Sequence, residues 1–275
     1  MSDHFRSFSF VDRILSDDVG KRIVGEYEVP ETIDSFAPSL VSESIGQCAA
    51  MSAMRAVDFQ FRPVAGIAGT VEFLREVHPG QTLRLEADLA KANEEAVEYD
   101  GVALVDGEPV VRLHDCLGPM VPMADFDDPE AVNGRYDLLS GEGAESGVFP
   151  GVPEFSFEWK EKVAGESGEA EFVIPESAPF FGDHFPRNPV FPGTLLMKVN
   201  LALVHELAET LPGEGRWQAN GMKDVKLRAF MPPGEALTLH AEVEEIEGDK
   251  AVIYVQSRKG KRRNSGARVL LSRHE

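Results

Sequence analysis

Residues 180–198 read FFGDHFPRNPVFPGTLLMK, and this stretch decides the fold more than any other part of the chain. One histidine, His184, lies in a segment with three prolines, and because proline fixes the backbone φ angle we expect a rigid loop. Pro192 and Gly193 then precede a long apolar run that is typical of a buried helix. The first turn of a helix has free backbone N–H groups that stabilise negative charge. A histidine base beside such a site is suited to removing a proton next to a carbonyl group.

An internal repeat supplies the acid that this chemistry also needs. Residues 38–47 (PSLVSESIGQ) align with residues 193–202 (GTLLMKVNLA), which places Glu43 opposite Lys198 at an offset of 155 residues (198 minus 43). A second pair of segments, 71–89 and 225–243, aligns through matching Pro-Gly steps at an offset of 154 residues (233 minus 79). Two offsets that agree within one residue indicate two copies of one unit.

The repeat predicts the organisation of the chain. We expect an N-terminal copy at residues 1–123 and a C-terminal copy at residues 154–275. The segment between them, 124–153, is rich in Asp, Glu, Gly and Pro and is therefore expected to be a linker.

The two copies are not chemically equal. The C-terminal copy has His184, but the matching position of the N-terminal copy is Val29 (184 minus 155). The N-terminal copy has Glu43, whereas the C-terminal copy has Lys198. If the copies pack with pseudo-two-fold symmetry, His184 and Glu43 meet at the shared interface. The symmetry-related site, with Val29 and Lys198, is then expected to be inactive.

The segment HFPRNPVFPGTL (184–195) resembles the characteristic loop of the bacterial 3-hydroxyacyl-[acyl-carrier-protein] dehydratases. LVSESIGQ (40–47) resembles the start of their central helix, and residues 8–29 and 222–243 resemble their strands. The resemblance covers nearly the whole chain apart from 124–153. Because the fold of that family is a hot dog, a long helix wrapped by an antiparallel sheet, the resemblance implies an α+β double hot dog. Two central helices would each be wrapped by an antiparallel β-sheet and related by a pseudo-two-fold axis.

The resemblance also implies an activity, the removal of water from a 3-hydroxyacyl thioester to give a trans-2-enoyl thioester. The substrate would be linked to acyl carrier protein or coenzyme A, in fatty acid, related lipid or polyketide biosynthesis. One site per chain is implied, and no metal or redox cofactor is required. Since family members that also isomerise the double bond carry Asp, Glu43 favours dehydration alone.

The roles implied for individual residues follow from the same resemblance. His184 would take the proton beside the carbonyl group, and Glu43 would donate a proton to the leaving hydroxyl group. The Gly193 N–H would stabilise the enolate oxygen, and Gln47, one helical turn after Glu43, could hold its carboxylate. The predicted site comprises the catalytic residues His184 and Glu43 and the oxyanion- or substrate-binding residues Gly193, Gln47, Phe185 and Pro192.

Length and composition favour a cytoplasmic protein with two cores. The chain has 275 residues, enough for about two domains, and 43% of them are hydrophobic. No apolar run reaches the roughly 18 residues that span a membrane, and the first residues lack the apolar core of a signal peptide. Cys48 and Cys116 are expected to be small buried side chains of a reduced cytosolic protein.

The net charge of −20 argues against nucleic acid as a partner. An acyl carrier protein, itself acidic, would need a local basic patch, and the chain could also form a homo-oligomer. The candidates for such a patch are Arg187, Lys223, Lys226, Arg228 and the turn RKGKRR at 258–263, which could equally be a solvated hairpin tip.

Hydrophobic periodicity predicts the same order of elements in both copies. In the first copy we expect strands near 6–14, 20–29, 69–76, 81–92, 97–105 and 109–117, a helix near 38–54, and a hairpin turn at Asp106-Gly107. In the second copy we expect strands near 154–163, 168–174, 222–230, 236–246, 250–257 and 266–273 and a helix near 193–211.

Two other classes of function remain open at this point. A hot-dog thioesterase would use a carboxylate to activate water, but thioesterases lack the histidine loop. A non-catalytic acyl-binding or scaffold protein would not need both His184 and Glu43. Lys198 either reaches solvent from its helix or pairs inside the inactive second site. His114 is expected to be an ordinary strand residue.

Overall fold

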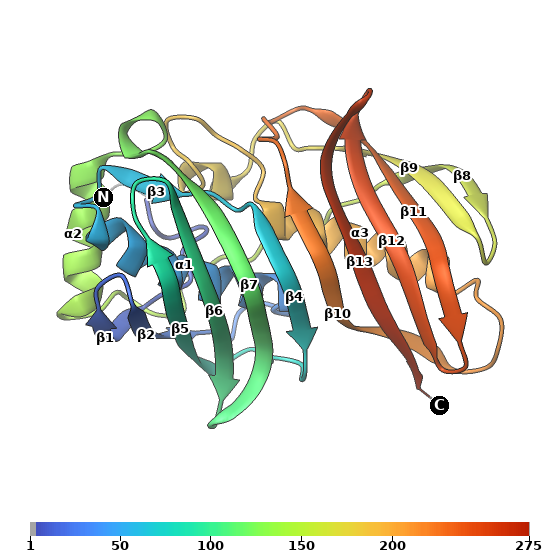
Figure 1. Ribbon diagram of the computed structural model, residues 1–275, viewed down its shortest axis with the longest axis horizontal. Helices are drawn as coiled ribbons and strands as arrows, with labels where there is room; N and C mark the ends of the chain where they lie inside the picture. The colour runs from blue at the N-terminus through green and yellow to red at the C-terminus, as the bar shows by residue number, and fades with distance from the viewer. Residues whose placement is uncertain (1–3, 275) are drawn as a thin grey trace.

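A computed structural model describes residues 4–274, and its main feature is one antiparallel sheet of 13 strands that covers two helices, α1 and α3 (Figure 1). The strand order is β1-β2-β5-β6-β7-β4-β10-β13-β12-β11-β9-β8, with β3 paired to β7 beside this path. The order of the first six strands is repeated, in reverse, by the last six. The sequence therefore predicted the repeated order of elements correctly.

Most elements of the N-terminal half fall close to the predicted ranges. They are β1 (Arg13–Asp18), β2 (Arg22–Glu28), α1 (Pro38–Ala56), β3 (Phe61–Pro63), β4 (Ile67–Phe73), β5 (Thr82–Ala92), β6 (Ala96–Val105) and β7 (Glu108–Pro122). A short 3-10 helix η1 (Met123–Asp125) and the helix α2 (Pro129–Ser140) follow.

The C-terminal half repeats the pattern of strands around one long helix. It contains β8 (Glu158–Val163), β9 (Ser167–Val173), η2 (Pro179–Gly182), α3 (Gly193–Ala208), β10 (Arg216–Leu227), β11 (Ala236–Glu247), β12 (Lys250–Lys259) and β13 (Arg262–His274).

Local sequence explains these elements. In β5, TLRLEADL alternates exposed and buried side chains, as expected for a strand with one face on the core. Asp106 and Gly107 both have positive φ angles, 53° and 81°, so the predicted hairpin turn between β6 and β7 is confirmed. The helix α3 is apolar on nearly every side because the sheet covers it, and Leu195, Leu196 and Leu203 are fully buried.

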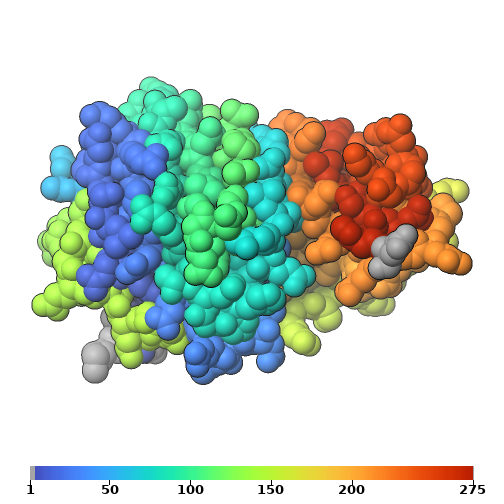
Figure 2. All heavy atoms as spheres, turned by 90° about the horizontal axis from the view of Figure 1, so that it is seen from below, coloured from blue at the N-terminus to red at the C-terminus, as the bar shows by residue number. Residues whose placement is uncertain are grey.

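The two halves join edge to edge. β4 pairs with β10 in an antiparallel register from Gly221 opposite Glu72 to Lys226 opposite Ile67, which makes the sheet continuous. The space-filling view shows the halves packed side by side along the molecule (Figure 2). Since α1 also contacts α3, side chains from both halves can reach one interface.

The segment 124–153, expected to be a linker, contains a helix that the sequence analysis did not predict. It contains α2, whose N-cap residue Asp128 accepts a hydrogen bond from the Glu130 N–H at 3.2 Å and whose first residue is a proline. Val132 and Leu139 of this helix are buried. The abundance of Gly, Asp and Pro concealed a helix that has only a narrow apolar side.

The first predicted strand, residues 6–14, is also largely wrong. Regular pairing begins only at Arg13, in β1. Before it, backbone N–H groups bond to side chains instead of to a neighbouring strand: those of Ser7 and Phe8 to Asp183, and that of Phe10 to Gln47. Within residues 4–274, no helix combines the length and apolarity needed to cross a membrane.

Candidate active site

His184 lies in the loop between η2 and α3, and its ring orientation is fixed by one hydrogen bond. Nδ1 is 3.0 Å from the Val190 carbonyl oxygen, and because a carbonyl only accepts, Nδ1 carries the proton. Nε2 therefore has the free lone pair of a base. The ring stacks on Phe185, with centroids 4.2 Å apart, and meets the Phe8 ring edge-on at 5.6 Å.

Burial lowers the pKa of His184 below its ordinary value of 6.5, because the charged imidazolium loses water among these aromatic rings. The nearby Glu43 carboxylate opposes this shift, and the Arg62 guanidinium reinforces it. The net direction favours a neutral ring, the form that can accept a proton.

Glu43 comes from the other half of the chain, on α1, and both of its carboxylate oxygens are held. Gln47 Nε2 donates to Oε1 at 3.0 Å, and the Thr194 hydroxyl group of α3 donates to Oε2 at 2.6 Å. Gln47 is itself fixed, since its Oε1 accepts from the Phe10 N–H at 2.8 Å and its Nε2 also donates to the Phe8 carbonyl oxygen at 3.0 Å. Gln47 therefore links Glu43 to the backbone of residues 8 and 10.

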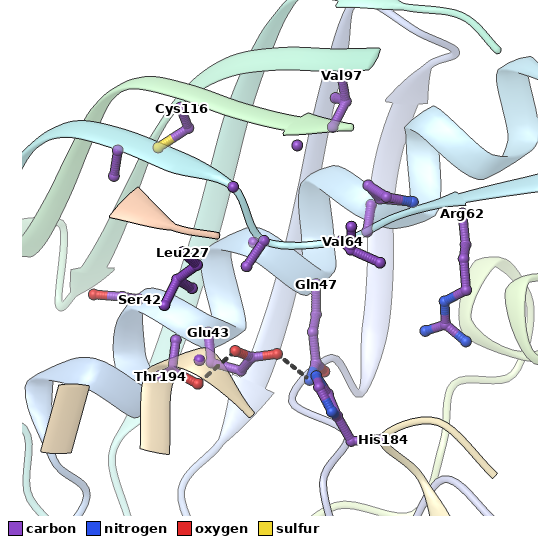
Figure 3. Close-up of a pocket in the computed structure, with 18 of the residues that line it drawn as sticks. Ser42, Glu43, Gln47, Arg62, Val64, Val97, Cys116, His184, Thr194 and Leu227 are labelled. Carbon is purple, nitrogen blue, oxygen red and sulfur yellow. Dashed lines mark hydrogen bonds between the residues drawn. The ribbon is translucent and has the colours of Figure 1, made fainter. Parts of the chain in front are cut away.

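Glu43, Gln47, Thr194 and His184 lie together at the cavity wall (Figure 3). The cavity, with a volume of about 270 Å³, takes its lining from both halves of the chain. Beyond the polar group its walls are mainly apolar, and they include Met51 and Met54 of α1, Met197 of α3 and Met222 of β10. A mainly apolar cavity with a few convergent polar groups is the usual form of a small-molecule site.

Gly193 is the first residue of α3 and lines this cavity. Pro192 is the N-cap residue of the helix and is not among the residues that line the cavity. Within residues 4–274, the Gly193 N–H has no hydrogen-bond acceptor, as expected for the first turn of a helix. A Cβ atom at this position would come within 2.2 Å of Leu227 Cδ1, so the present position of the Leu227 side chain depends on glycine here. Phe185 also lines the cavity.

Thr194 and Arg62 were missed by the sequence analysis. Thr194 directly follows the Pro-Gly step, but nothing marked its hydroxyl group as a partner of Glu43. Arg62, on β3, lies 4.0 Å above the Phe185 ring and donates to Asp127 at 3.1 Å. Burial lowers the pKa of Arg62 to about 10. An isolated Arg in a short strand gives no periodic signal in the sequence.

The matching positions of the other copy lie away from the cavity. Val29 is fully buried in the core. Lys198 is half-buried, and burial lowers its pKa while Glu154 opposes the shift. His114 lies on β7 near Glu72, at 3.9 Å, and is half-exposed, as expected for a strand residue. Cys48 and Cys116 are free and buried.

Three of the basic residues proposed for carrier docking, Lys226, Arg228 and Arg263, line a surface groove together with acidic residues. Arg268 also lines this groove, whose carboxylates belong to Asp224, Glu242 and Glu244. The groove is therefore of mixed charge. Across the described chain, no three His, Cys, Asp or Glu side chains are grouped closely enough to hold a metal ion.

Comparison with known proteins identifies the family of this chain. The model of the ApeI-like dehydratase family matches residues 160–267, which include His184 and Gly193. The 3-hydroxyacyl-[acyl-carrier-protein] dehydratase FabZ of Roseiflexus castenholzii is 34% identical over 119 residues, which cover 39% of this chain and 82% of that protein. This chain belongs to the FabZ dehydratase family.

Solved structures extend the likeness of fold over nearly the whole chain. A MaoC-like dehydratase has a TM-score of 0.54 and 13% identity, covering 94% of this chain and 98% of that one. The 12:0-ACP thioesterase from Umbellularia californica has a TM-score of 0.54 and 12% identity, covering 92% and 94%. At such low identity these likenesses show the fold alone, which is of the hot-dog type.

Proposed function

We propose that this FabZ family member dehydrates 3-hydroxyacyl thioesters to trans-2-enoyl thioesters, with one site per chain formed by His184 and Glu43. The observation that carries the proposal is the placement of His184, whose Nδ1 bonds to the Val190 carbonyl oxygen, and of the Glu43 carboxyl group on one cavity. We further propose that the chain is a double hot dog of two copies, 1–123 and 154–275, joined by 124–153. The mirrored strand order supports this.

In the proposed reaction, Nε2 of His184 takes the proton from the carbon beside the thioester carbonyl. The electron pair of that C–H bond becomes the new C=C bond as the C–O bond of the hydroxyl group breaks. Glu43 gives its proton to the departing oxygen, which leaves as water. Each such proton transfer contributes about a hundredfold to ten-thousandfold to the rate.

Three other groups assist this step. The Gly193 N–H stabilises the negative charge that develops on the carbonyl oxygen. Gln47 and Thr194 hold the Glu43 carboxyl group in place, and because a hydroxyl group both donates and accepts, Thr194 can bond to Glu43 in either protonation state. The apolar remainder of the cavity would take the acyl chain.

Acyl carrier protein or coenzyme A would carry the substrate, in a fatty acid or related biosynthetic pathway. The name of the related FabZ protein supports the carrier protein. We infer no nucleic-acid partner, since the charge of −20 opposes binding to phosphate groups.

The test is to incubate the protein with 3-hydroxyacyl thioesters of graded chain length on both carriers. Absorbance of the 2-enoyl thioester and release of free thiol are followed together. We expect enoyl product without thiol. Release of thiol without enoyl product would instead show a thioesterase, and binding without either product an acyl-binding protein.

Two variants link that activity to the site. His184→Ala and Glu43→Gln should each lower kcat by at least about a hundredfold, because each removes one proton-transfer group. Lys198→Ala is the matched control, since Lys198 occupies the helix position equivalent to Glu43 but lies away from the cavity. Substantial turnover by Glu43→Gln would mean that another group supplies the acid.

A further inference from the structure

The chain segment before β1, residues 4–10, crosses the candidate site as an irregular strap. Phe5, Phe8 and Ser9 of this N-terminal strap line the cavity, and the Phe8 ring meets His184 edge-on. The strap belongs to the half of the chain that supplies Glu43, yet it lies against the half that supplies His184.

One side chain, Asp183, holds the strap. Its carboxylate accepts hydrogen bonds from three strap N–H groups: Phe5 at 2.5 Å, Ser7 at 2.6 Å and Phe8 at 2.7 Å. Asp183 is buried, with 8% of its surface exposed. Hydrogen bonds to an ionised group are stronger than neutral ones, and three on one buried carboxylate fix the local backbone firmly.

From the strap the hydrogen bonds continue to the acid. The Phe8 carbonyl oxygen accepts from Gln47 Nε2, and the Phe10 N–H donates to Gln47 Oε1. The same Gln47 amide group donates to Glu43. Asp183, the residue directly before His184, is therefore connected to Glu43 through the strap and Gln47.

A second contact supports the strap from α2. The guanidinium group of Arg135 lies 5.4 Å from the centre of the Phe5 ring and donates to the Val11 carbonyl oxygen at 3.3 Å. Phe5 has a positive φ angle of 68°, which is uncommon for an aromatic residue and persists only where neighbours determine it. The strap is thus held at several points rather than draped over the surface.

We infer that Asp183 is a positioning residue for the proposed dehydration: by clamping the strap, it fixes Gln47, and through Gln47 the Glu43 carboxyl group, relative to His184. The inference rests on the proposed function. Asp183 does not transfer a proton itself. Its contribution is to keep the acid and the base, which come from different halves of the chain, at the distance and orientation that the reaction needs.

The test compares Asp183→Asn with Asp12→Asn. Asp12 is a matched control because it is also 8% exposed and also accepts a backbone N–H, that of Glu28 at 2.8 Å, but does not line the cavity. We expect Asp183→Asn to lower kcat about tenfold to a hundredfold with little change in KM. Asp12→Asn should lower only the thermal stability.

Hydrogen exchange and a double variant separate positioning from a general loss of stability. Backbone amides of residues 5–8 should exchange faster in Asp183→Asn than in the natural protein. In Asp12→Asn they should exchange at the natural rate. The kcat of the double variant Asp183→Asn with Gln47→Ala should lie no more than about twofold below that of the less active single variant, since both residues act through one network.

Each remaining outcome is decisive. An inactive natural protein would overturn the proposed function. If the natural protein is active, two results would overturn this inference alone. In one, Asp183→Asn speeds hydrogen exchange in the strap but keeps full kcat; in the other, Asp183→Asn leaves hydrogen exchange in the strap unchanged. Fully multiplicative losses in the double variant would also overturn it, because Asp183 would then not act through Gln47.

Discussion

At the scale of single residues, the site depends on which hydrogen bonds each polar group has already made. The Nδ1 of His184 bonds to Val190, so only Nε2 can act as a base. Both oxygens of Glu43 are held, one by Gln47 of its own helix and one by Thr194 of the other half. Two side chains held in this way would lose little entropy when a substrate binds.

The lowered pKa of His184 predicts the pH dependence of the reaction. Its pKa lies below 6.5 because burial and Arg62 outweigh the effect of Glu43. As the base must be neutral, kcat/KM should stay on its plateau as the pH falls through 6.5 and decline only below it. A pH–rate profile measures this, and a decline centred at or above 6.5 would contradict it.

The same shift has a consequence for stability. Just below pH 6.5 the unfolded chain binds a proton at His184 that the folded chain does not. The free energy of unfolding therefore decreases as the pH is lowered through this range. In His184→Ala this contribution is absent.

At the scale of elements, the start of α3 is the critical junction. Gly193 and Thr194 line the cavity there, and a Cβ atom at Gly193 would collide with the Leu227 side chain of β10. Because glycine has no side chain, Leu227 can keep its present position against the helix end.

Gly193→Ala should therefore disturb both packing and chemistry. The added Cβ would lie 2.2 Å from Leu227 Cδ1, which forces the Leu227 side chain or the helix end to move. We expect a loss of about 1–3 kcal/mol in the free energy of unfolding, measured by denaturant titration, together with a lower kcat/KM. Adding Leu227→Ala relieves the clash, so the double variant should regain activity; if it does not, the contact is not the cause.

At the scale of the whole molecule, the two halves contribute unequally to one cavity. The cavity takes in Glu43 and His184 but neither Val29 nor Lys198. Val29 is fully buried, and the Lys198 amine is partly desolvated near Glu154. This arrangement favours a single working site in each chain.

Titration of the protein with a non-reactive acyl thioester analogue should accordingly give one bound ligand per chain. Introducing Val29→His and Lys198→Glu into the His184→Ala protein should not restore turnover, because Val29 is closely packed and a histidine there would be overpacked. Two equivalent ligands per chain, or restored dehydration, would show that the second site is open.

Much of the fold was predictable because its signals are local. Alternating side chains gave the strands, and the Pro-Gly step gave the start of α3 at Gly193. The prediction failed at residues 6–12, where the N–H groups of Ser7, Phe8 and Phe10 bond to distant side chains. It also missed α2, whose apolar side is narrow.

The sequence by itself determined the repeat and the order of the elements. It also singled out His184 and Glu43, because the equivalent position of the other copy holds a different residue in each case. Only the tertiary structure decided what holds them. Thr194 meets Glu43 across 151 positions of the chain, and Asp183 meets Phe5 across 178. Such contacts leave no periodic pattern in the sequence, because a hydrogen bond between distant residues depends on how the halves pack rather than on local spacing.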